Sequence, residues 1–465
     1  IAKAARTYAS SDGAGIPWTP ITDQQISSTS AIRLHSILRA VTGNLDVVGG
    51  ELLSGFSESY IPESELALHE MLSEEQKTKQ LGYKDHPVFT YRVAEMLKES
   101  TDKVWGYPYA DLVMGCHMAN PTNVFRAMAT ANPYPVKALI TLGNNTLMSY
   151  ANQHQIMQGL MNQDLIVAHE IFMTPTAMLA DYVLPGDVFT ERNHVADTWS
   201  WSNRLMLSQK IGEPPEKASS TFQFWTDLGR RMGLEEYFSW DTIEEMLDYR
   251  LSRSKRTFSD FEKERYMELP PPKFRKYRKN GFATPSGKVE LYSTILADLD
   301  FDPLPYYREG PRPTKEYPYT VFTGVREDPF FQTGQRNIRV LRDRCPVPKL
   351  FLHPIDAKRE DVSEDDWVCL ETSSGRVTAQ ISVQESMRES HVRVPHGWWY
   401  PETRGEEKLA GAFISSDAVL CSDDDEFLDL EQGVPHFKGF PGRIFKVTQP
   451  VISRTSKVLE KNDPA

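Results

Sequence analysis

Two short apolar runs separated by a helical segment constrain the fold of this chain more than any other feature. The first run, 138–142, breaks into the turn 143–145, and the second run, 165–168, ends in the polar pair 169–170. A helical pattern over 148–161 joins the runs. Two buried strands joined by a helix predict a βαβ unit of a parallel sheet. Ligands bind beyond the carboxyl ends of such strands, although an ordinary α/β domain with polar loops fits the same pattern.

The size and charge of the chain exclude several classes of protein. Its 465 residues leave room for about three domains. The 52 basic and 64 acidic residues give a net charge of −12, which disfavours a broad nucleic-acid surface. No apolar run approaches the ~20 residues of a membrane-spanning helix, so we expect no direct membrane insertion. The four cysteines are too dispersed for a CxxC-type metal cluster or a disulfide framework, and we expect buried or incidental thiols.

The N-terminal region has the character of a domain interior. Residues 1–5 lack an initiator Met or a signal peptide, so we expect that an N-terminal part of the full protein is missing. Residues 30–41 form an amphipathic pattern that Gly43 ends, which predicts a helix. The basic segment 273–279 could grip phosphates, but a solvated connector is favoured.

From about Tyr317 the pattern changes to short, β-branched segments. Four of them, 319–323, 367–371, 376–382 and 391–395, read as strands. The turn at 373–375 predicts a hairpin between the second and third. The C-terminal region is therefore expected to be rich in β-structure, and a barrel is favoured.

Self-contained catalytic motifs are absent from the sequence. It has no GxGxxG, P-loop, HExxH or GxSxG motif, and its 11 histidines show no close metal spacing. A hydrolase with a nucleophile elbow or a P-loop module is therefore disfavoured. Polar loop residues at strand ends, spread over two regions, suit a large elongated cofactor better than a local triad.

The order of these segments resembles the molybdopterin oxidoreductase family of the dimethyl-sulfoxide-reductase type. Its members bind molybdenum or tungsten between two molybdopterin guanine dinucleotides. The similarity covers roughly residues 1–50, 138–235 and 282–447, and within the family thiosulfate or polysulfide reductases and acetylene hydratase are nearest. The matching segments are Thr42 to Asp46 with Gly49-Gly50, Gly143-Asn144-Asn145, His169-Glu170 with Thr174, Ala180 to Pro185, Glu191-Arg192-Asn193, Thr284 to Lys288, Thr323-Gly324 with Arg326, Phe331-Gln332-Thr333, His353-Pro354, Val394 to Trp399 and Phe437-Lys438.

The resemblance implies an α/β fold with a Rossmann-like parallel-sheet domain followed by a C-terminal β-barrel of the double-psi type. The implied divisions are the end of an upstream α/β domain (1–50), the pterin-dinucleotide-binding domain (51–240), a connector (241–315), the barrel (316–450) and a tail (451–465).

The resemblance also implies cofactor contacts around the parallel sheet. Glu170, in place of the commoner Asp, would accept two hydrogen bonds from guanine. Asn144, Asn145 and His169 would line the nucleotide and ribose. Arg192 and Lys438 would offset pyrophosphate or pterin-side charge as isolated cations. The remaining implied contacts near the strand ends are Gly143 and Thr174.

A second implied set lies on the barrel. Thr323, Gly324 and Gln332 would present donors to the pterin, and glycine at 324 allows a close backbone approach. Gln24 is matched to a pterin-contacting glutamine. The other implied cofactor contacts are Arg326, Thr333 and Trp398.

Two residues are candidates for catalysis. The resemblance implies that Arg336 faces the substrate funnel and that His396, with Trp398, lines it. The alternatives are an exposed structural arginine and packed loop aromatics.

The chain departs from the family pattern in places. Gln332 stands where many relatives have His, and Ala418, beside Asp417, stands where they have Asn. No cysteine falls where the family places its iron–sulfur or metal ligands, so we assign no metal ligand. The [4Fe–4S] cluster is expected in the missing N-terminal part, and this chain alone is expected to be inactive.

The function implied is the C-terminal portion of the catalytic subunit of a molybdenum or tungsten bis-pterin oxidoreductase. It would transfer an oxygen atom, or hydride and electrons, on a small substrate. An iron–sulfur electron-transfer subunit is the implied partner, with a membrane anchor subunit as a further candidate. A degenerate scaffold subunit without catalysis is the alternative.

Overall fold

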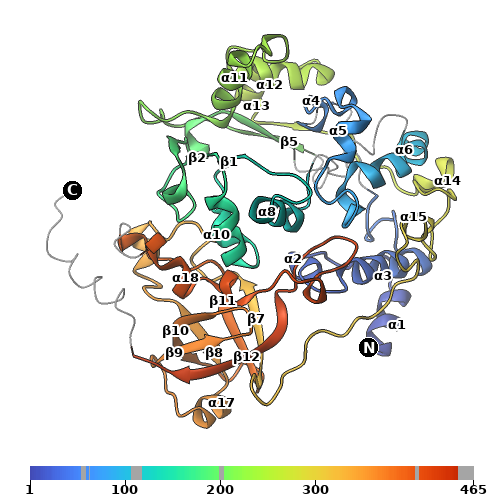
Figure 1. Ribbon diagram of the computed structural model, residues 1–465. Helices are drawn as coiled ribbons and strands as arrows, with labels where there is room; N and C mark the ends of the chain where they lie inside the picture. The colour runs from blue at the N-terminus through green and yellow to red at the C-terminus, as the bar shows by residue number, and fades with distance from the viewer. Residues whose placement is uncertain (54–58, 62, 106–117, 198–203, 404–407, 449–465) are drawn as a thin grey trace. The chain divides into compact units, whose positions relative to one another are not determined.

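The chain folds into two compact units. A computed structural model describes residues 1–53, 59–61, 63–105, 118–197, 204–403 and 408–448 (Figure 1). The first unit comprises residues 1–22, 29–120 and 185–307, and the second comprises 23–28, 121–184 and 308–465. The second unit therefore holds both the parallel sheet and the C-terminal β-structure. The chain passes between the two units at residues other than the predicted domain boundaries. The segment that contains the parallel sheet packs in one hydrophobic core with C-terminal residues such as Trp399 and Ala412, and it therefore belongs to the second unit.

The parallel sheet of the second unit confirms the predicted strands. It has the order β1 (Ala138–Leu142), β2 (Leu165–Glu170) and β3 (Tyr182–Pro185). β1 and β2 are parallel, with Leu142 opposite His169, so their carboxyl ends lie at one edge. The sequence pattern did not single out β3 as a strand.

The predicted single helix over 148–161 is wrong, because the structure has two helices there. α9 (Thr146–Ser149) ends before Asn152, and α10 (Gln153–Met161) follows it. Asn152 adopts a left-handed conformation with φ 56°, and its side chain accepts a hydrogen bond from the Gln155 backbone N–H at 3.2 Å. This N-cap starts α10 in a new direction.

The C-terminal part of the second unit confirms the predicted β-barrel. Six strands close in the order β10-β8-β11-β7-β12-β9. Burial alternates along β7 and β10, whereas successive residues are buried in β8 and β9. The core of the barrel holds fully buried Tyr319, Val321, Leu350 and Ile381. The predicted hairpin at 373–375 joins two antiparallel strands. The strands are β7 (Tyr319–Val325), β8 (Lys349–Leu352), β9 (Trp367–Glu371), β10 (Arg376–Val383), β11 (His391–Pro395) and β12 (Lys438–Lys446).

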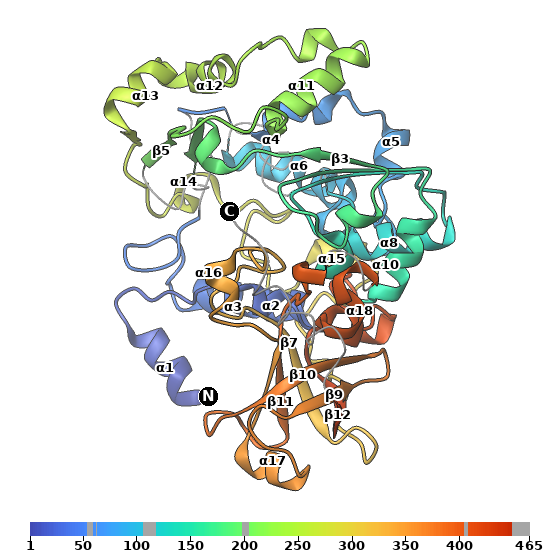
Figure 2. The same ribbon diagram turned by 90° about the vertical axis from the view of Figure 1, so that its left-hand side faces the viewer.

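Short helices lie at both ends of the barrel. In both views, α17 (Pro354–Arg359) lies at one end, and α18 (Ala412–Ser415) lies at the other, toward α10 (Figures 1 and 2). The end that carries α18 is also where the loops after β7 and β11 meet, as described below. The other helices of this unit are α8 (Pro121–Thr130), η3 (Ala177–Leu179), α16 (Arg339–Arg342), η7 (Pro401–Thr403), η8 (Lys408–Gly411), η9 (Asp417–Leu420) and η10 (Asp425–Phe427).

The first unit is mainly helical around a small antiparallel sheet. Its core contains Leu205, Leu247 and Phe261. The predicted helix over 30–41 is confirmed, and Gly43 follows it at φ 75°. The sheet has the order β4 (His194–Asp197), β5 (Arg204–Ser208) and β6 (Tyr266–Glu268).

The helices of the N-terminal region and the first unit are α1 (Ala2–Ser10), α2 (Pro20–Asp23), α3 (Ser28–Val41), α4 (Glu63–Leu66), η1 (His69–Met71), α5 (Glu74–Thr78), η2 (Pro87–Phe89), α6 (Tyr91–Trp105), η4 (Phe189–Glu191), α11 (Thr221–Arg231), η5 (Glu235–Tyr237), α12 (Ile243–Leu251), η6 (Ser252–Ser254), α13 (Phe258–Glu264), α14 (Tyr277–Asn280) and α15 (Thr294–Asp298). Within the described ranges, no helix combines the length and apolar character needed to cross a bilayer. Cys345, Cys369 and Cys421 are buried free thiols, as expected, whereas Cys116 lies outside the described residues.

Candidate functional site

The carboxyl ends of β1 and β2 bring the first set of predicted residues together. The Gly143 backbone N–H donates to the His169 carbonyl at 2.9 Å, which holds the two strand ends side by side. Gly143 has φ 56°, and a Cβ atom there would meet no atom within 4 Å. Space beyond the strand ends is therefore open, as a site for an extended ligand requires.

Asn145 is buried and ties the two loops together from inside. Its Oδ1 accepts hydrogen bonds from the Thr176 hydroxyl at 2.8 Å and from the Thr176 N–H at 3.2 Å. The same hydroxyl accepts from the Leu147 N–H at 2.9 Å. These bonds hold Asn145 between the two loops, and its contact with a nucleotide stays a prediction. Thr176 was not predicted from the sequence.

Asn144 and Glu170 carry the half-buried polar groups at this edge. Asn144 Oδ1 accepts from the Thr146 hydroxyl at 3.1 Å, and Glu170 Oε1 accepts from the Ile171 N–H at 2.9 Å. Burial raises the pKa of the Glu170 carboxyl. By contrast, His169 is buried, and Thr174 is buried with its hydroxyl accepting from the Ala177 N–H at 3.2 Å.

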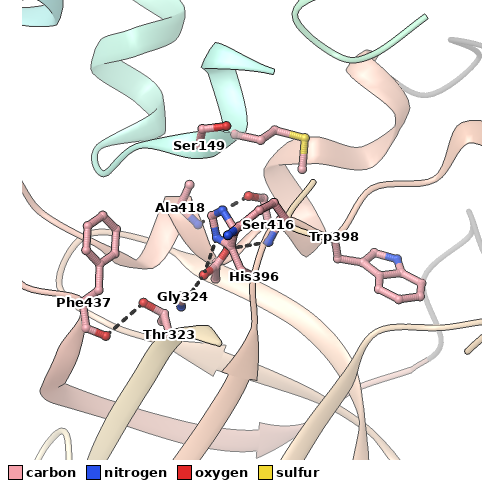
Figure 3. A network of polar contacts seen from close by, with 12 residues as sticks. Ser149, Thr323, Gly324, His396, Trp398, Ser416, Ala418 and Phe437 are labelled. Carbon is pink, nitrogen blue, oxygen red and sulfur yellow. Dashed lines mark hydrogen bonds and ion pairs between the residues drawn. The ribbon is translucent and has the colours of Figure 1, made fainter. Parts of the chain in front are cut away.

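The barrel contributes a second set, which includes Thr323, Gly324 and His396 (Figure 3). The buried carboxylate of Asp417 lies among them. It accepts hydrogen bonds from the backbone N–H groups of Gly324 at 2.9 Å and Gly397 at 2.8 Å, and it lies 3.0 Å from His396 Nδ1. These contacts lower the pKa of Asp417 below its ordinary value, although burial alone would raise it. Sequence reasoning assigned Asp417 no role, and its separation from Gly324 and His396 in the chain leaves no local signal for one.

Gln24 and Lys438, from distant parts of the sequence, converge on Gly324 within the second unit. A Cβ atom on Gly324, whose φ is 67°, would lie 2.9 Å from Lys438 Nζ and 3.2 Å from Gln24 Oε1. The Phe437 N–H donates to the Gln24 carbonyl at 3.2 Å, and Lys438 Nζ donates to the Thr323 carbonyl. Four predicted residues, Gln24, Thr323, Gly324 and Lys438, are therefore neighbours.

Lys438 has no carboxylate partner among the described residues. Its one hydrogen bond to them goes to a carbonyl, and burial lowers the pKa of its ammonium group. The nearby charge of Asp417 opposes this effect, but the two groups form no ion pair, so Lys438 is a half-buried cation that an anionic ligand can neutralise.

Arg336 is 1% exposed, so the alternative of an exposed structural arginine is wrong. Its guanidinium donates to the carbonyls of Gln332 at 2.6 Å and His396 at 2.8 Å. The rings of Phe330 and Trp398 flank it, with centroids 4.8 and 5.2 Å from Cζ. Burial and the nearby Arg342 lower the pKa of Arg336 to about 9, so the group remains charged at pH 7. Arg336 thus ties its own loop to the end of β11, an arrangement different from an open funnel wall.

The other barrel candidates lie around this arginine. Trp398 is buried and packs against Arg342, with 4.4 Å between Cζ and the ring centroid. Thr333 is buried, and its carbonyl accepts from Trp399 Nε1 at 2.8 Å. Gln332 is exposed at φ 52°, and Arg326 is exposed over the Phe331 ring. For Trp398 the arrangement matches the packed-aromatic alternative.

Arg192 belongs to the first unit and is not the isolated cation that was predicted. Its guanidinium pairs with the buried carboxylate of Asp187 in the same unit. This partner was not apparent from the sequence because Asp187 lies in a loop with no regular pattern. In the described part of the chain, no group of three or more His, Cys, Asp or Glu residues could hold a metal ion.

Two family descriptions match the chain. Residues 76–231 match a molybdopterin oxidoreductase model, and residues 320–424 match a molydopterin dinucleotide binding domain. The second match contains β7 to β11 and Asp417. The two matches therefore contain both sets of residues described above, apart from Gln24 and Lys438.

The chain is also similar to individual proteins. It is 43% identical to acetylene hydratase of Syntrophotalea acetylenica, over 94% of this chain and 61% of that protein. It is 23% identical to dopamine dehydroxylase of Eggerthella lenta, over 93% of this chain and 48% of that protein. It is 25% identical to dimethyl sulfoxide reductase of Escherichia coli, over 59% of this chain and 38% of that protein. The chain thus spans between about two fifths and three fifths of the length of these relatives.

Among solved structures, the acetylene hydratase from Pelobacter acetylenicus superimposes with a TM-score of 0.91 at 42% identity. The match covers 96% of this chain and 62% of that structure. The fold described above is therefore shared over nearly the whole chain.

Proposed function

Since the chain belongs to the molybdopterin oxidoreductase family, we propose that its second unit holds a molybdopterin guanine dinucleotide in the catalytic subunit of a molybdenum or tungsten enzyme. The reaction proposed is transfer of an oxygen atom, or of hydride and electrons, on a small substrate. When bound, the metal cofactor supplies two-electron redox chemistry. The residues of this chain bind and orient it and offset its charge.

The observation that carries this proposal is the convergence of Gln24 and Lys438 on Gly324. The absence of a side chain at Gly324 leaves room for the Lys438 ammonium group, which donates to a carbonyl and forms no ion pair with a described carboxylate. A pyrophosphate or pterin is anionic or rich in acceptors, and an ammonium group with a nearby amide suits both. The residues present therefore fit the cofactor that the family binds.

At the sheet edge, the open space next to Gly143 suits the nucleotide end of the same ligand. Asn144 and Glu170 offer half-buried acceptors there. A carboxylate can accept two hydrogen bonds from a guanine edge. Asn145 and Thr176 support this edge from within.

The experiment is metal and nucleotide analysis of the full-length protein purified without oxygen. We expect close to one molybdenum or tungsten atom per chain and release of guanine nucleotide by acid. In the Lys438→Met variant, nucleotide content should fall. The matched control is Lys446→Met, because Lys446 lies on the same strand and already pairs with Asp366 at 2.8 Å. Wild-type protein with neither metal would reject the proposal.

Hydration of a small unsaturated hydrocarbon is a second candidate reaction. The identity of 43% to a protein named acetylene hydratase, against 25% to one named as a reductase, favours it. Adding water to acetylene yields acetaldehyde without net electron transfer, so no electron donor or acceptor is consumed. Acetaldehyde formed from acetylene in the anaerobic enzyme would support hydration. Oxidation of reduced viologen by thiosulfate or dimethyl sulfoxide, without acetaldehyde formation, would support the first candidate instead.

Under the redox candidate we also propose an iron–sulfur electron-transfer subunit as partner. Net reduction of a substrate requires an electron supply, which the protein–cofactor unit alone does not provide. Affinity purification from the native source, followed by iron and sulfide analysis of the co-purified chains, tests this. Recovery of the protein alone in fully active form would contradict it.

A further inference from the structure

The imidazole of His396 is fixed by one of its two nitrogens. Nδ1 lies 3.0 and 3.1 Å from the two carboxylate oxygens of Asp417. That carboxylate also accepts from two backbone N–H groups, and its lowered pKa keeps it ionised at neutral pH. An ionised carboxylate only accepts, so Nδ1 carries the hydrogen. In the neutral ring Nε2 is then an unprotonated acceptor.

The second nitrogen of the ring, Nε2, remains available as a hydrogen-bond acceptor. It makes no hydrogen bond within the part of the chain that the structure describes, and the His396 side chain is 11% exposed although its partner is 1% exposed. The backbone also fixes the residue, because the His396 N–H donates to the Val325 carbonyl at 2.8 Å. His396 therefore lies beside the carboxyl end of β7, near Gly324 (Figure 3). Gln24 and Lys438 also approach Gly324.

Charged groups of both signs lie around the ring. The Asp417 carboxylate accepts from Nδ1, and the Arg336 guanidinium donates to the His396 carbonyl. Lys438 and the Cys421 thiol both lie near Asp417, and burial keeps the thiol protonated by raising its pKa. The Asp417 carboxylate lies against Nδ1 and is therefore placed to stabilise a transient imidazolium.

We propose that His396 is the proton-transfer group of the cofactor-binding end of the barrel and that Asp417 is its positioning residue. The inference rests on the proposed function. An O–H bond of water, or of a substrate, breaks as the Nε2–H bond forms, and the resulting imidazolium is stabilised by Asp417. The return step passes the proton to the product or to solvent. The ring ends neutral, and no electron leaves it.

Both candidate reactions need such a group. Hydration divides a water molecule into hydroxyl and proton, and reduction of an oxygenated substrate consumes protons to release water. The residue sits beside the predicted pterin contacts Thr323 and Gly324, so the proton would be moved close to the proposed cofactor.

The decisive variant is His396→Asn. Its amide can still donate toward Asp417, which preserves the buried contact, but it has no equivalent of Nε2. We expect at least a 100-fold loss of turnover with unchanged guanine nucleotide content, and loss of one limb of the pH–rate profile. His391→Asn is the matched control, because His391 begins the same strand, its Nδ1 lies 2.7 Å from the Glu389 carbonyl and its ring stacks on Phe322. That control should keep the wild-type rate and profile.

Asp417→Asn tests the positioning role separately. The asparagine amide would donate to Nδ1 and shift the hydrogen to Nε2, so turnover should fall about as far as in His396→Asn while the fold remains. Nitrogen-15 NMR of histidine-labelled protein reports the tautomer directly, with the His396 signals identified by their loss in His396→Asn. We expect the Nδ1–H form in the wild type and the Nε2–H form in Asp417→Asn.

Two outcomes would overturn the inference. One is a wild-type His396 in the Nε2–H form, which needs no cofactor to observe. The other is a His396→Asn variant that contains cofactor and retains the wild-type rate and pH profile, since His396 would then serve packing alone. Failure of the proposed function looks different, because the wild-type protein itself would then lack metal and guanine nucleotide.

Discussion

Thr176 donates two hydrogen bonds to the buried Asn145 Oδ1, one from its hydroxyl at 2.8 Å and one from its backbone at 3.2 Å. The pair joins the loop after β1 to the loop after β2. The two strand ends are therefore held in register by side chains as well as by the sheet. The hydrogen bonds between Thr176 and Asn145 therefore support the open edge of the sheet beside Gly143.

Replacing Thr176 by Val should destabilise the protein. The change removes one donor from buried Asn145 and the acceptor of the Leu147 N–H, and the loss of buried hydrogen bonds costs about 1–3 kcal/mol. Urea unfolding followed by tryptophan fluorescence measures the free energy of unfolding. Thr78→Val, at an exposed helix position, is the control and should change it by less than about 0.5 kcal/mol. Equal free energies of unfolding for the two variants would show that the hydrogen bonds of Thr176 are dispensable.

Removing the Glu170 carboxylate should weaken retention of guanine nucleotide. We expect Glu170→Ala to lose about 1–3 kcal/mol of binding free energy, because a paired acceptor is lost at a half-buried site. Glu170→Asp should restore part of the binding. Nucleotide released by acid from equal amounts of purified protein is the measurement. Unchanged content in Glu170→Ala would remove Glu170 from the site.

The same carboxyl gives a pH dependence. Burial raises its pKa, so the ionised form that accepts guanine hydrogen bonds is lost at a higher pH than for an ordinary glutamate. Nucleotide retention in the wild type should therefore decrease as the pH falls through this raised pKa. Glu170→Gln should show a flatter dependence over the same range, and identical curves for the two proteins would contradict the assignment.

The parallel strands and the barrel could be predicted because their signals are local. The apolar runs at β1 and β2 and the hairpin at 373–375 each specify structure within a few residues. The break between α9 and α10 at Asn152 was missed because the apolar residues keep their helical spacing across it, although the backbone of Asn152 is left-handed. The local sequence signals therefore predicted the strands more accurately than the boundaries of the helices.

The candidate site was less predictable because its key contacts join distant residues. The Asp417–His396 pair and the approach of Gln24 to Gly324 join segments that are far apart in the sequence, and neither is marked by a spacing in it. The family resemblance implied that Arg336 faces a substrate funnel, and an exposed structural arginine was the alternative. Its burial depends on carbonyls that the loop, with left-handed Gln332 and Gln335, turns toward it.

Replacing Arg336 by Lys should therefore lower stability. Lysine cannot span the carbonyls of Gln332 and His396 or stack between two rings, so buried acceptors lose their donors at a cost of about 2–4 kcal/mol. Arg339→Lys is the matched control, since the Arg339 side chain is 91% exposed. Thermal unfolding should show a clear decrease for the first variant and little change for the second. Similar midpoints for both would mean that the guanidinium contacts contribute little.

The buried carboxylate of Asp417 should make the protein sensitive to acid. Its pKa in the folded state is below the unfolded value of about 3.9, so its stabilising contribution is complete above that value and is lost as the pH falls toward the folded pKa. Unfolding free energy measured between pH 6 and pH 2.5 should therefore drop most steeply below about pH 4. Asp417→Asn cannot ionise, so its stability should be lower at pH 6 and should fall less on acidification. Asp366→Asn is the control for a less buried carboxylate, because the Asp366 side chain is 26% exposed, pairs with Lys446 and also has a lowered pKa. Solvent screens that pair, so its removal should change the slope less than the loss of Asp417 does. If the two variants gave the same slope, the hydrogen bonds from Gly324, Gly397 and His396 would not be the source of the acid sensitivity.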